Sequence, residues 1–514
     1  MRAVGTILFL VILATAVATF ARRWRIPAPS LLVLAGLGVA LIPGTPALHI
    51  PPHTIALVVL PPLLYASAEE LSLRDLRQVW RPVTVLAFGL VLASAAAVGA
   101  IVMAVTPLPA SMAFVLGAVL ASTDPVAVTA LGRRLSLPGR VQVLVQAESL
   151  FNDATSLVLF KVAVGIAVAS STVHWPMAVG QFALLAGGGT AVGAVAAGLV
   201  ALIRRRTTDP VLDTVIALVT PYAAYVLAES VHTSGVTAVV VAGVLLGRSG
   251  HRLSDARIRL QVQAVYAVVV FLLESVVFSI VGLELPALVR DLPADTGWWP
   301  LQAAVIAVVL IGVRILWMLP LAAVARPRRD GPSWRTAAVV TWAGTRGVMP
   351  LAAALSIPLI ADDGHALPGR ELVLVLTTAV VVLTLVVQGL TLAPVVNRSG
   401  LALEPEHTAK EELHARDALT RAALDHLDQL TDLETVPEAT LTRMQRNLSA
   451  RLDDEGGGTP ADSADAAYRD LRHEIIAVQN SELRRLYDDH EISDTTRRRV
   501  QTDLDREESA LGER

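Results

Sequence analysis

The stretch AESLFNDA, residues Ala147–Ala154, lies in the middle of an apolar run that covers residues 141–169. A helix needs about 20 mostly apolar residues to cross the hydrocarbon core of a bilayer, so this run is long enough to span it. Charged side chains are costly at that depth, and those found there usually have a partner or a function. The stretch therefore predicts a membrane helix that carries a polar site.

The polar residues of this stretch are spaced to share one helix face. Ser149, Asn152 and Asp153 stand at positions i, i+3 and i+4, which brings a hydroxyl, an amide and a carboxylate together. Oxygen ligands of this kind suit a hard monovalent cation. Glu148 lies five positions before Asp153, roughly 140° around the helix, so we expect it to contact a different partner.

The composition excludes several classes of protein. Of 514 residues, 54% are hydrophobic and 17% are charged, against roughly 25% charged residues in soluble domains. The chain has no cysteine, which excludes disulfides, thiol nucleophiles, Cys-ligated zinc and iron–sulfur clusters. Residues 401–514 hold 15 basic and 27 acidic side chains, so an acidic tail follows the apolar body, and no feature indicates nucleic-acid binding.

Apolar segments recur along the first 400 residues. They predict an all-α polytopic membrane protein with about thirteen transmembrane helices, near residues 4–20, 27–43, 54–68, 83–105, 110–131, 141–169, 176–202, 211–230, 234–247, 260–285, 301–324, 336–360 and 371–396. Alternate loops carry arginine clusters, such as Arg204–Arg206, and the loops between them carry few. Cytoplasmic loops are enriched in Lys and Arg, so we expect a multi-pass cell-membrane protein with its N-terminus outside and its tail in the cytoplasm.

Both ends of the chain leave alternatives. The first segment could be a cleaved signal peptide, but its arginines follow the apolar run instead of preceding it, which favours a retained helix. Residues 398–514 are expected to form a helical cytoplasmic tail, either regulatory or simply accessory. Gly456–Pro460 should interrupt it, and its leucines recur at helical spacing, at Leu413, Leu419, Leu424, Leu427, Leu430 and Leu433.

Two predicted membrane helices contain helix-breaking residues. In the segment 110–131, Pro125 follows Thr123 and Asp124, and a proline inside a helix removes a backbone donor and breaks or kinks the helix. In the segment 336–360, Arg346 stands between Gly344 and Gly347. Paired interruptions of this kind are typical of transporters with inverted repeats and a site between them. The plainer alternatives are a kink capped by Asp124 and an Arg346 that only forms an ion pair.

Other motifs do not indicate a cofactor. The stretch AGGGTAVGAVAAG, residues 186–198, resembles a phosphate loop, but small residues spaced four apart in an apolar helix favour close helix packing. No HExxH, GxGxxG or Walker pattern occurs in a suitable context. We therefore expect neither a cofactor nor a resident metal ion.

Five stretches, taken in order, resemble one known family. They are TDPVAV (Thr123–Val128), AESLFNDA, YVLAESVHTSGV (Tyr225–Val236), LESVVFSIVG (Leu273–Gly282) and TWAGTRGVMPLA (Thr341–Ala352). Together they resemble the sodium/proton exchangers of the NhaP/NHE branch of the monovalent cation/proton antiporters. The resemblance covers about residues 1–400, and ESLFND after TDP is its most specific part.

The resemblance implies a fold and a set of site residues. Residues 1–397 would form a transmembrane antiporter domain of a homodimer, with a dimerisation subdomain and a core subdomain that holds two crossed broken helices. By position, Asp153 matches the ion-binding carboxylate and Asn152 its preceding asparagine. The other matches are Thr123 and Asp124 in the first broken helix, Ser149 as an oxygen ligand, Glu148 and Arg314 as a core salt bridge, and Arg346 in the second broken helix.

A mechanism follows from these residues. A proton and a cation would compete for the Asp153 carboxylate. Since Asn152 stands where a second carboxylate could be, we expect electroneutral 1:1 exchange of H⁺ for Na⁺, serving pH and sodium homeostasis. Many members have an acidic residue after LPPLLY where this chain has Ala66, which leaves K⁺/H⁺ antiport as the alternative. A gated cation channel and an intramembrane enzyme using Ser149 are weaker alternatives.

Overall fold

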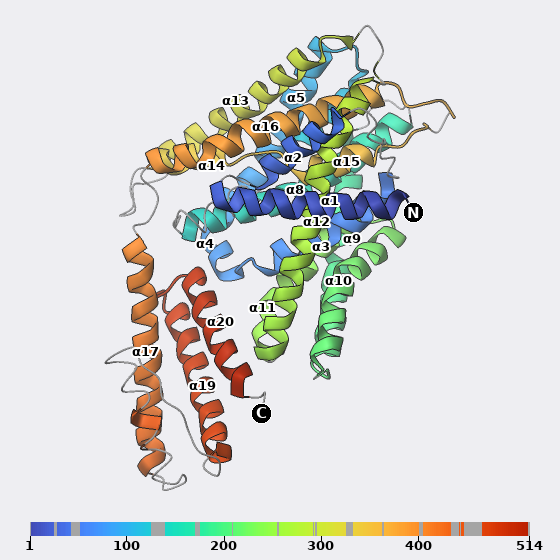
Figure 1. Ribbon diagram of the computed structural model, residues 1–514. Coiled ribbons are helices and arrows are strands. Elements are labelled where there is room, and N and C mark those ends of the chain that lie inside the picture. The colour runs from blue at the N-terminus through green and yellow to red at the C-terminus, as the bar shows by residue number, and fades with distance from the viewer. Residues whose placement is uncertain are drawn as a thin grey trace. The chain divides into compact units, whose positions relative to one another are not determined.

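The computed structural model describes residues 2–24, 28–42, 52–124, 139–169, 175–207, 209–253, 256–290, 292, 296–324, 333–361, 364–399, 405–432, 442, 444–446 and 465–511. Within these ranges the regular elements are helices, and one isolated antiparallel bridge joins Ile360 to Ala366 (Figure 1). The all-α class expected from the sequence is confirmed.

Apolar helices make up the larger part of the fold. Among the described residues, seven helical stretches are long and apolar enough to cross a membrane, and five shorter apolar helices accompany them. The elements before the tail are α1 (Arg2–Trp24), α2 (Ala28–Ala40), α3 (Pro52–Glu69), α4 (Leu73–Thr84), the π-helix η1 (Val85–Leu90), α5 (Val91–Val105), α6 (Ala110–Leu120), α8 (Gly139–Val168), α9 (Trp175–Arg204), α10 (Pro210–Ser230), α11 (Gly235–Leu253), α12 (Ala256–Arg290), α13 (Trp299–Val324), α14 (Ser333–Trp342), α15 (Val348–Leu355) and α16 (Arg370–Ser399). The number thirteen and the inverted repeats stay predictions.

Three predicted segments differ from the helices in detail. The segment 83–105 is the second part of a continuous helical stretch that begins at Leu73 and runs through α4, η1 and α5. In the segment 110–131, helix α6 ends at Leu120 and residues 122–124 are not helical, while Pro125 and the residues after it lie outside the described residues. The segment 336–360 consists of two short helices, α14 and α15, with a non-helical link between them. The second interruption is thus confirmed, and in the first segment α6 ends before the predicted break at Pro125.

Helix α16 is largely buried inside the apolar body. It packs against α2, α6, α13, α14 and α15, and α5 in turn packs against α13 (Figure 1). An apolar cluster joins α16 to η1, α8, α13 and α14 through Leu86, Leu90, Val141, Val145, Met318, Val339, Val340, Ala343, Leu392 and Val396. This core places α8, with its polar face, beside both interrupted segments.

The glycine-rich stretch of α9 serves close packing. A β-carbon on Gly189 would lie 2.6 Å from the carbonyl oxygen of Ser234, and one on Gly193 would lie 2.4 Å from that of Ala238. Only glycine leaves room for α11 at these two positions. The packing interpretation of the sequence is confirmed.

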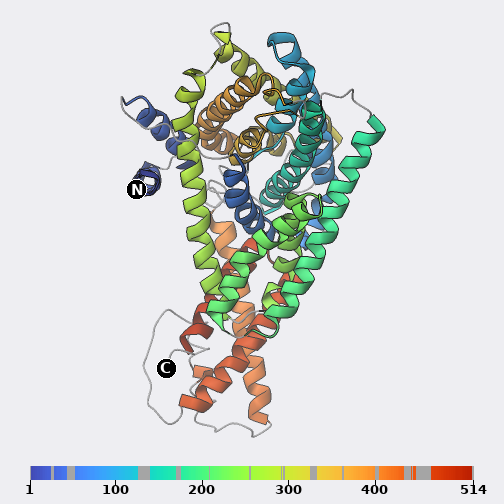
Figure 2. The same cartoon turned by 90° about the vertical axis from the view of Figure 1, so that its right-hand side faces the viewer.

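The chain divides into two compact units, and the smaller one contains Thr208–Thr214, Ser254–Ala264 and Leu403–Arg514. Its tail helices are α17 (Pro405–Asp432), α19 (Asp465–Asp488) and α20 (Asp494–Leu511), which lie side by side (Figure 2). Leu419 and Leu427 are buried between them, as expected, but Leu413 is 59% exposed, because helical spacing alone does not fix the width of the buried face. The predicted interruption at Gly456–Pro460 lies outside the described residues.

Candidate ion-binding site

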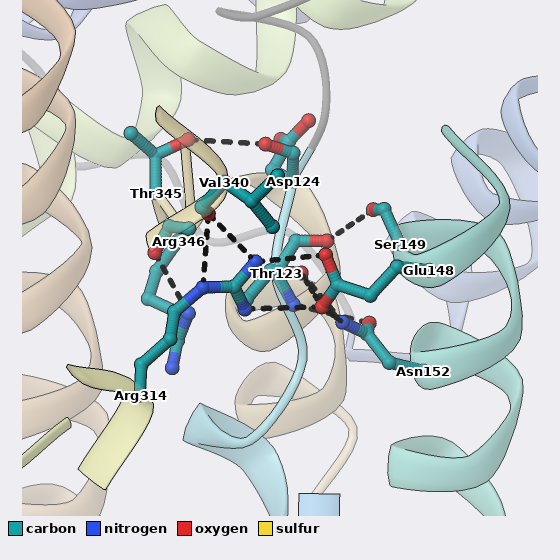
Figure 3. Close-up of polar contacts among 10 residues, drawn as sticks. Thr123, Asp124, Glu148, Ser149, Asn152, Arg314, Val340, Thr345 and Arg346 are labelled. Carbon is teal, nitrogen blue, oxygen red and sulfur yellow. Dashed lines mark hydrogen bonds and ion pairs between the residues drawn. The ribbon is translucent and has the colours of Figure 1, made fainter. Parts of the chain in front are cut away.

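The two interrupted segments meet through backbone hydrogen bonds. After α6 ends at Leu120, residues 122–124 are buried and non-helical. The N–H of Asp124 donates to the carbonyl of Thr345 at 2.8 Å, and the Thr345 hydroxyl donates to the carbonyl of Asp124 at 3.0 Å (Figure 3). Each break therefore provides hydrogen-bond partners for backbone groups of the other break, which would otherwise be unpaired inside the apolar body.

The Asp124 carboxylate lies at the N-terminus of α15. Its Oδ2 accepts the backbone N–H of Val348 at 3.3 Å, and the positive end of a helix favours a negative charge at this place. A β-carbon on Gly347 would lie 1.4 Å from the same oxygen, so this approach requires glycine. The kink cap considered from the sequence is thus a contact with a second helix.

The polar face of α8 contacts the first break at every expected position. The Ser149 hydroxyl donates to the carbonyl of Thr123, and the Asn152 amide donates to the Thr123 hydroxyl. The Thr123 N–H donates to the Asn152 oxygen at 3.2 Å, while Asp153 accepts the hydroxyl of Ser122. These side chains are all buried, with Asp153 only 5% exposed. Spacing along α8 has brought a carboxylate, hydroxyls and an amide together, as expected.

Glu148 forms a buried two-point ion pair with Arg314. Arg314 Nη1 and Nη2 donate to the two carboxylate oxygens of Glu148 at 3.0 and 2.8 Å, and its Nε donates to the carbonyl of Val340 at 3.2 Å (Figure 3). The pair ties α8 to α13 and α14. Glu148 Oε1 also accepts from the Asn152 amide at 2.9 Å, because these residues are one helical turn apart. Glu148 therefore has its own partner but is not separate from the polar face.

Arg346 is buried in the second break and is held through neutral groups. Its Nη1 donates to the carbonyl of Gly344 at 2.8 Å, and its backbone N–H donates to the Thr384 hydroxyl at 3.2 Å. Its Nε has no hydrogen-bond partner among the described residues. Within that part of the chain Arg346 forms no ion pair below 4.0 Å, so the plainer interpretation of Arg346 as an ion-pair residue gains no support.

Sequence reasoning missed three polar contacts of this site. Ser122 holds Asp153 and was detectable, because it directly precedes Thr123 in the predicted break. Thr345 was detectable as a polar residue between the glycines of the second break. Thr384 lies in the apolar run of α16, and nothing in the sequence pairs it with Arg346.

Comparison with known proteins covers nearly the whole chain. Residues 8–398 match the family described as "Sodium/hydrogen exchanger, transmembrane". An uncharacterized Na⁺/H⁺ exchanger of Mycobacterium tuberculosis is 32% identical over 512 residues, which cover 95% of this chain and 92% of the relative. The Na⁺/H⁺ antiporter ApNhaP of Aphanothece halophytica is 32% identical over 438 residues, 83% of this chain and 82% of that protein.

The fold also matches a solved structure. The sodium proton antiporter MjNhaP1 from Methanocaldococcus jannaschii superimposes with a TM-score of 0.63 at 20% sequence identity. The match covers 79% of this chain and 99% of that chain. The two chains therefore share a fold over most of their length.

Proposed function

The chain belongs to the sodium/hydrogen exchanger family, and from that premise we propose that it exchanges one H⁺ for one Na⁺ at Asp153 without net charge movement. Exchange of H⁺ for a monovalent cation across the cell membrane follows from the family and its antiporter relatives. The choice of Na⁺, the stoichiometry and the role of each residue are the content of the proposal.

The observation that carries the stoichiometry is the charge of the buried cluster. Three buried carboxylates, of Asp124, Glu148 and Asp153, accompany two buried guanidinium groups, of Arg314 and Arg346. With all five groups charged, the cluster has one net negative charge. Uncompensated charge is costly in apolar surroundings, and either one proton or one monovalent cation compensates it. The two substrates therefore replace each other one for one.

Asp153 is the carboxylate best placed to receive the substrate. Glu148 is neutralised by Arg314, and Asp124 lies at the positive end of α15. Asp153 accepts a hydrogen bond from the neutral hydroxyl of Ser122. An incoming proton or cation gains most from the carboxylate that has no cationic group hydrogen-bonded to it.

Neutral oxygens lie next to this carboxylate. The hydroxyls of Ser122 and Ser149 and the carbonyl of Thr123 can supply lone pairs to a hard cation. Asn152 holds the Thr123 segment against α8 through two hydrogen bonds, one from its side-chain nitrogen and one to its side-chain oxygen. We assign Asn152 and Thr123 the task of positioning these oxygens, and Glu148 and Arg314 the task of holding α8 in place.

Exchange, as opposed to leakage, follows from the cost of moving the empty site. With neither substrate bound, the site carries its net charge through apolar surroundings, whereas either loaded form is neutral. A site that reorients only when loaded returns with H⁺ after it has released Na⁺. The energy for Na⁺ movement then comes from the proton gradient alone.

The proposed setting is a homodimer with an external N-terminus and a cytoplasmic tail. The native chain has no cysteine, so single cysteines in described loops can be labelled without background. Thr207→Cys, beside the cluster Arg204–Arg206, should react with a membrane-impermeant thiol reagent only from the cytoplasmic side. Gly297→Cys, an exposed position before α13, should react only from outside, and reaction of both from one side would exclude this orientation.

K⁺/H⁺ antiport is the second candidate, and one observation favours it. Ala66, in α3, stands where the resemblance to the family implies an acidic residue, and fewer carboxylates would weaken the preference for a small, strongly hydrated cation. In this alternative K⁺ replaces Na⁺ as the transported cation. The site and its charge balance stay the same.

The test uses purified protein in vesicles that contain a pH-sensitive dye. Na⁺, K⁺ and Li⁺ are added in turn to vesicles with an acidic interior, and the rate of alkalinisation is measured. We expect Na⁺ to give the fastest response and a proton gradient to drive Na⁺ uphill. Equal or faster response to K⁺ would select the second candidate, and no uphill movement of any cation would indicate a channel.

A further inference from the structure

A second ion pair begins on α8, outside the cluster of the ion site. Lys161 lies eight residues after Asp153, and its ammonium contacts Oε1 of Glu229 in the last turn of α10. The same carboxylate oxygen accepts the backbone N–H of Gly235, the first residue of α11, at 3.0 Å. Glu229 therefore joins three elements, α8, α10 and α11.

The helices joined by Glu229 differ in the neighbours with which they pack most extensively, and these neighbours define two packing groups. Helix α8 packs most extensively with α6 and α4 and shares an apolar cluster with α13, α14 and α16. It packs less extensively with α9, α11 and α3, and Val158 and Val162 contact the α9 residue Leu185 in a smaller cluster. Helix α11 packs mainly with α3 and α9. Among the described residues of the larger unit, Lys161 and Glu229 form the salt bridge that connects the first group to the second.

Accessibility distinguishes this pair from the pair at the ion site. The side chains of Lys161 and Glu229 are 31% and 36% exposed, whereas those of Arg314 and Glu148 are 4% and 1% exposed. Because Glu229 lies in the last turn of α10, both long side chains can reach water at the end of the helix when the pair separates, and a fully buried pair cannot.

We propose that the Lys161–Glu229 pair is a reversible latch that holds the ion-site helix α8 against the α10–α11 turn in one state of the exchange cycle. The inference rests on the proposed function, since reorientation of Asp153 requires α8 to move relative to α10 and α11. In the state described by the structure the latch is closed. It opens when α8 carries its site to the other side of the membrane.

Cross-linking tests the latch directly, because the chain has no native cysteine. Lys161→Cys with Glu229→Cys is reconstituted, and a thiosulfonate cross-linker that spans the two replaced side chains is added. Exchange should fall to the level of protein-free vesicles and return on reduction. Full exchange by the cross-linked protein would overturn the proposal. Exchange measured before cross-linking tests the proposed function separately.

A matched control joins two helices of the same packing group. Gln302 of α13 donates to the carbonyl of Val105 at the end of α5 at 2.8 Å, and both helices should move together. Val105→Cys with Gln302→Cys, cross-linked in the same way, should exchange at the rate of its reduced form. An equal loss at both sites would show that any cross-link stops the protein, and would overturn the assignment of a latch.

A double-mutant cycle covers the case in which the cysteine pair does not fold. Lys161→Met, Glu229→Gln and the double variant are compared by initial rate and by apparent cation KM. If the two residues act as one latch, the second substitution should add little to the first in both quantities. Independent effects of the two substitutions would overturn the proposal.

Discussion

The two ion pairs of α8 differ in burial, and this difference separates a fixed contact from a mobile one. Glu148 pairs with Arg314 beside the ion site, where both side chains are almost completely buried. Lys161, about three and a half turns further along the same helix, pairs with Glu229, and both side chains there are about one third exposed. Helix α8 thus carries two ion pairs: the Glu148 pair fixes it to α13, and the Lys161 pair can be released.

The energies of such pairs differ accordingly. Removal of one partner from a buried pair typically costs about 3–5 kcal/mol, because the remaining charge has neither water nor a counter-ion. An accessible pair contributes about 0–1 kcal/mol. Substitutions at the two pairs should therefore separate protein stability from transport.

Asp153 lies between the two pairs, and its replacement should have the largest effect. Asp153→Asn can still accept the Ser122 hydroxyl, but it can neither release a proton nor balance a cation. Exchange in vesicles should vanish, while the thermal unfolding midpoint stays equal or rises, since a buried charge has been removed. Gly297→Ala, which lies outside the site at a position where a β-carbon meets nothing within 4 Å, is the control and should retain exchange. Residual Na⁺-dependent proton release by Asp153→Asn would mean that another group carries the proton.

The second largest effect is expected at the buried pair. Glu148→Gln or Arg314→Ala leaves one buried charge without its partner and should destabilise the protein by about 3–5 kcal/mol. The yield of monodisperse protein and its unfolding midpoint measure this. The cation KM of the protein that does fold should change less. A stable variant with altered cation selectivity would contradict the positioning role of the pair.

An intermediate effect is expected at the second break. Gly347→Ala places a methyl group where Asp124 Oδ2 lies, so the carboxylate must leave the N-terminus of α15. We expect slower exchange together with a lower unfolding midpoint. Gly297→Ala is the control, because a β-carbon there meets nothing within 4 Å. Identical rates for the two variants would show that the Asp124 contact does not matter for transport.

A small effect on stability is expected at the accessible pair. Lys161→Met should change the free energy of unfolding by about 1 kcal/mol or less, because the pair is partly exposed. Its exchange rate should nevertheless differ from that of the native protein. An unfolding midpoint lowered as far as in Arg314→Ala would remove the distinction between the two pairs.

We expect the membrane voltage to have no effect on the exchange rate. One carboxylate that alternates between H⁺ and Na⁺ moves no net charge, so clamping the vesicle potential with valinomycin and K⁺ should leave the initial Na⁺-driven rate unchanged. A steep dependence on voltage would mean that a second group, Asp124 in the first place, also changes its protonation during the cycle.

The sequence predicted what local periodicity controls. Hydropathy located the apolar helices, and the spacing of Ser149, Asn152 and Asp153 predicted a shared face that the structure contains. Pro125 and Gly347 predicted two interrupted helices. These features depend on residues close together in the chain, which is why they can be derived without a fold.

Features that depend on tertiary contacts could not be derived. The hydroxyl of Thr384 accepts a hydrogen bond from the backbone N–H of Arg346. Thr384 lies 38 residues after Arg346, and no sequence pattern links the two residues. The end of α6 at Leu120 precedes Pro125 by several residues, because hydrogen bonds to α8 and to Thr345 determine the conformation of residues 122–124. Leu413 shares the helical spacing of its neighbours, but its side chain is exposed among the described residues.

The composition of the smaller unit bears on how the protein can be shortened for experiments. Its residues include Ser254–Ala264, so α12 begins in the unit that contains the tail and continues into the other unit. Asp505 of α20 accepts from Arg259 of α12 and also from Gln501 at 3.0 Å. A truncation after Ser399, at the apparent end of the membrane part, would remove the carboxylate that Arg259 binds. Shortened versions made for crystallisation should therefore keep α20, or replace Arg259 as well.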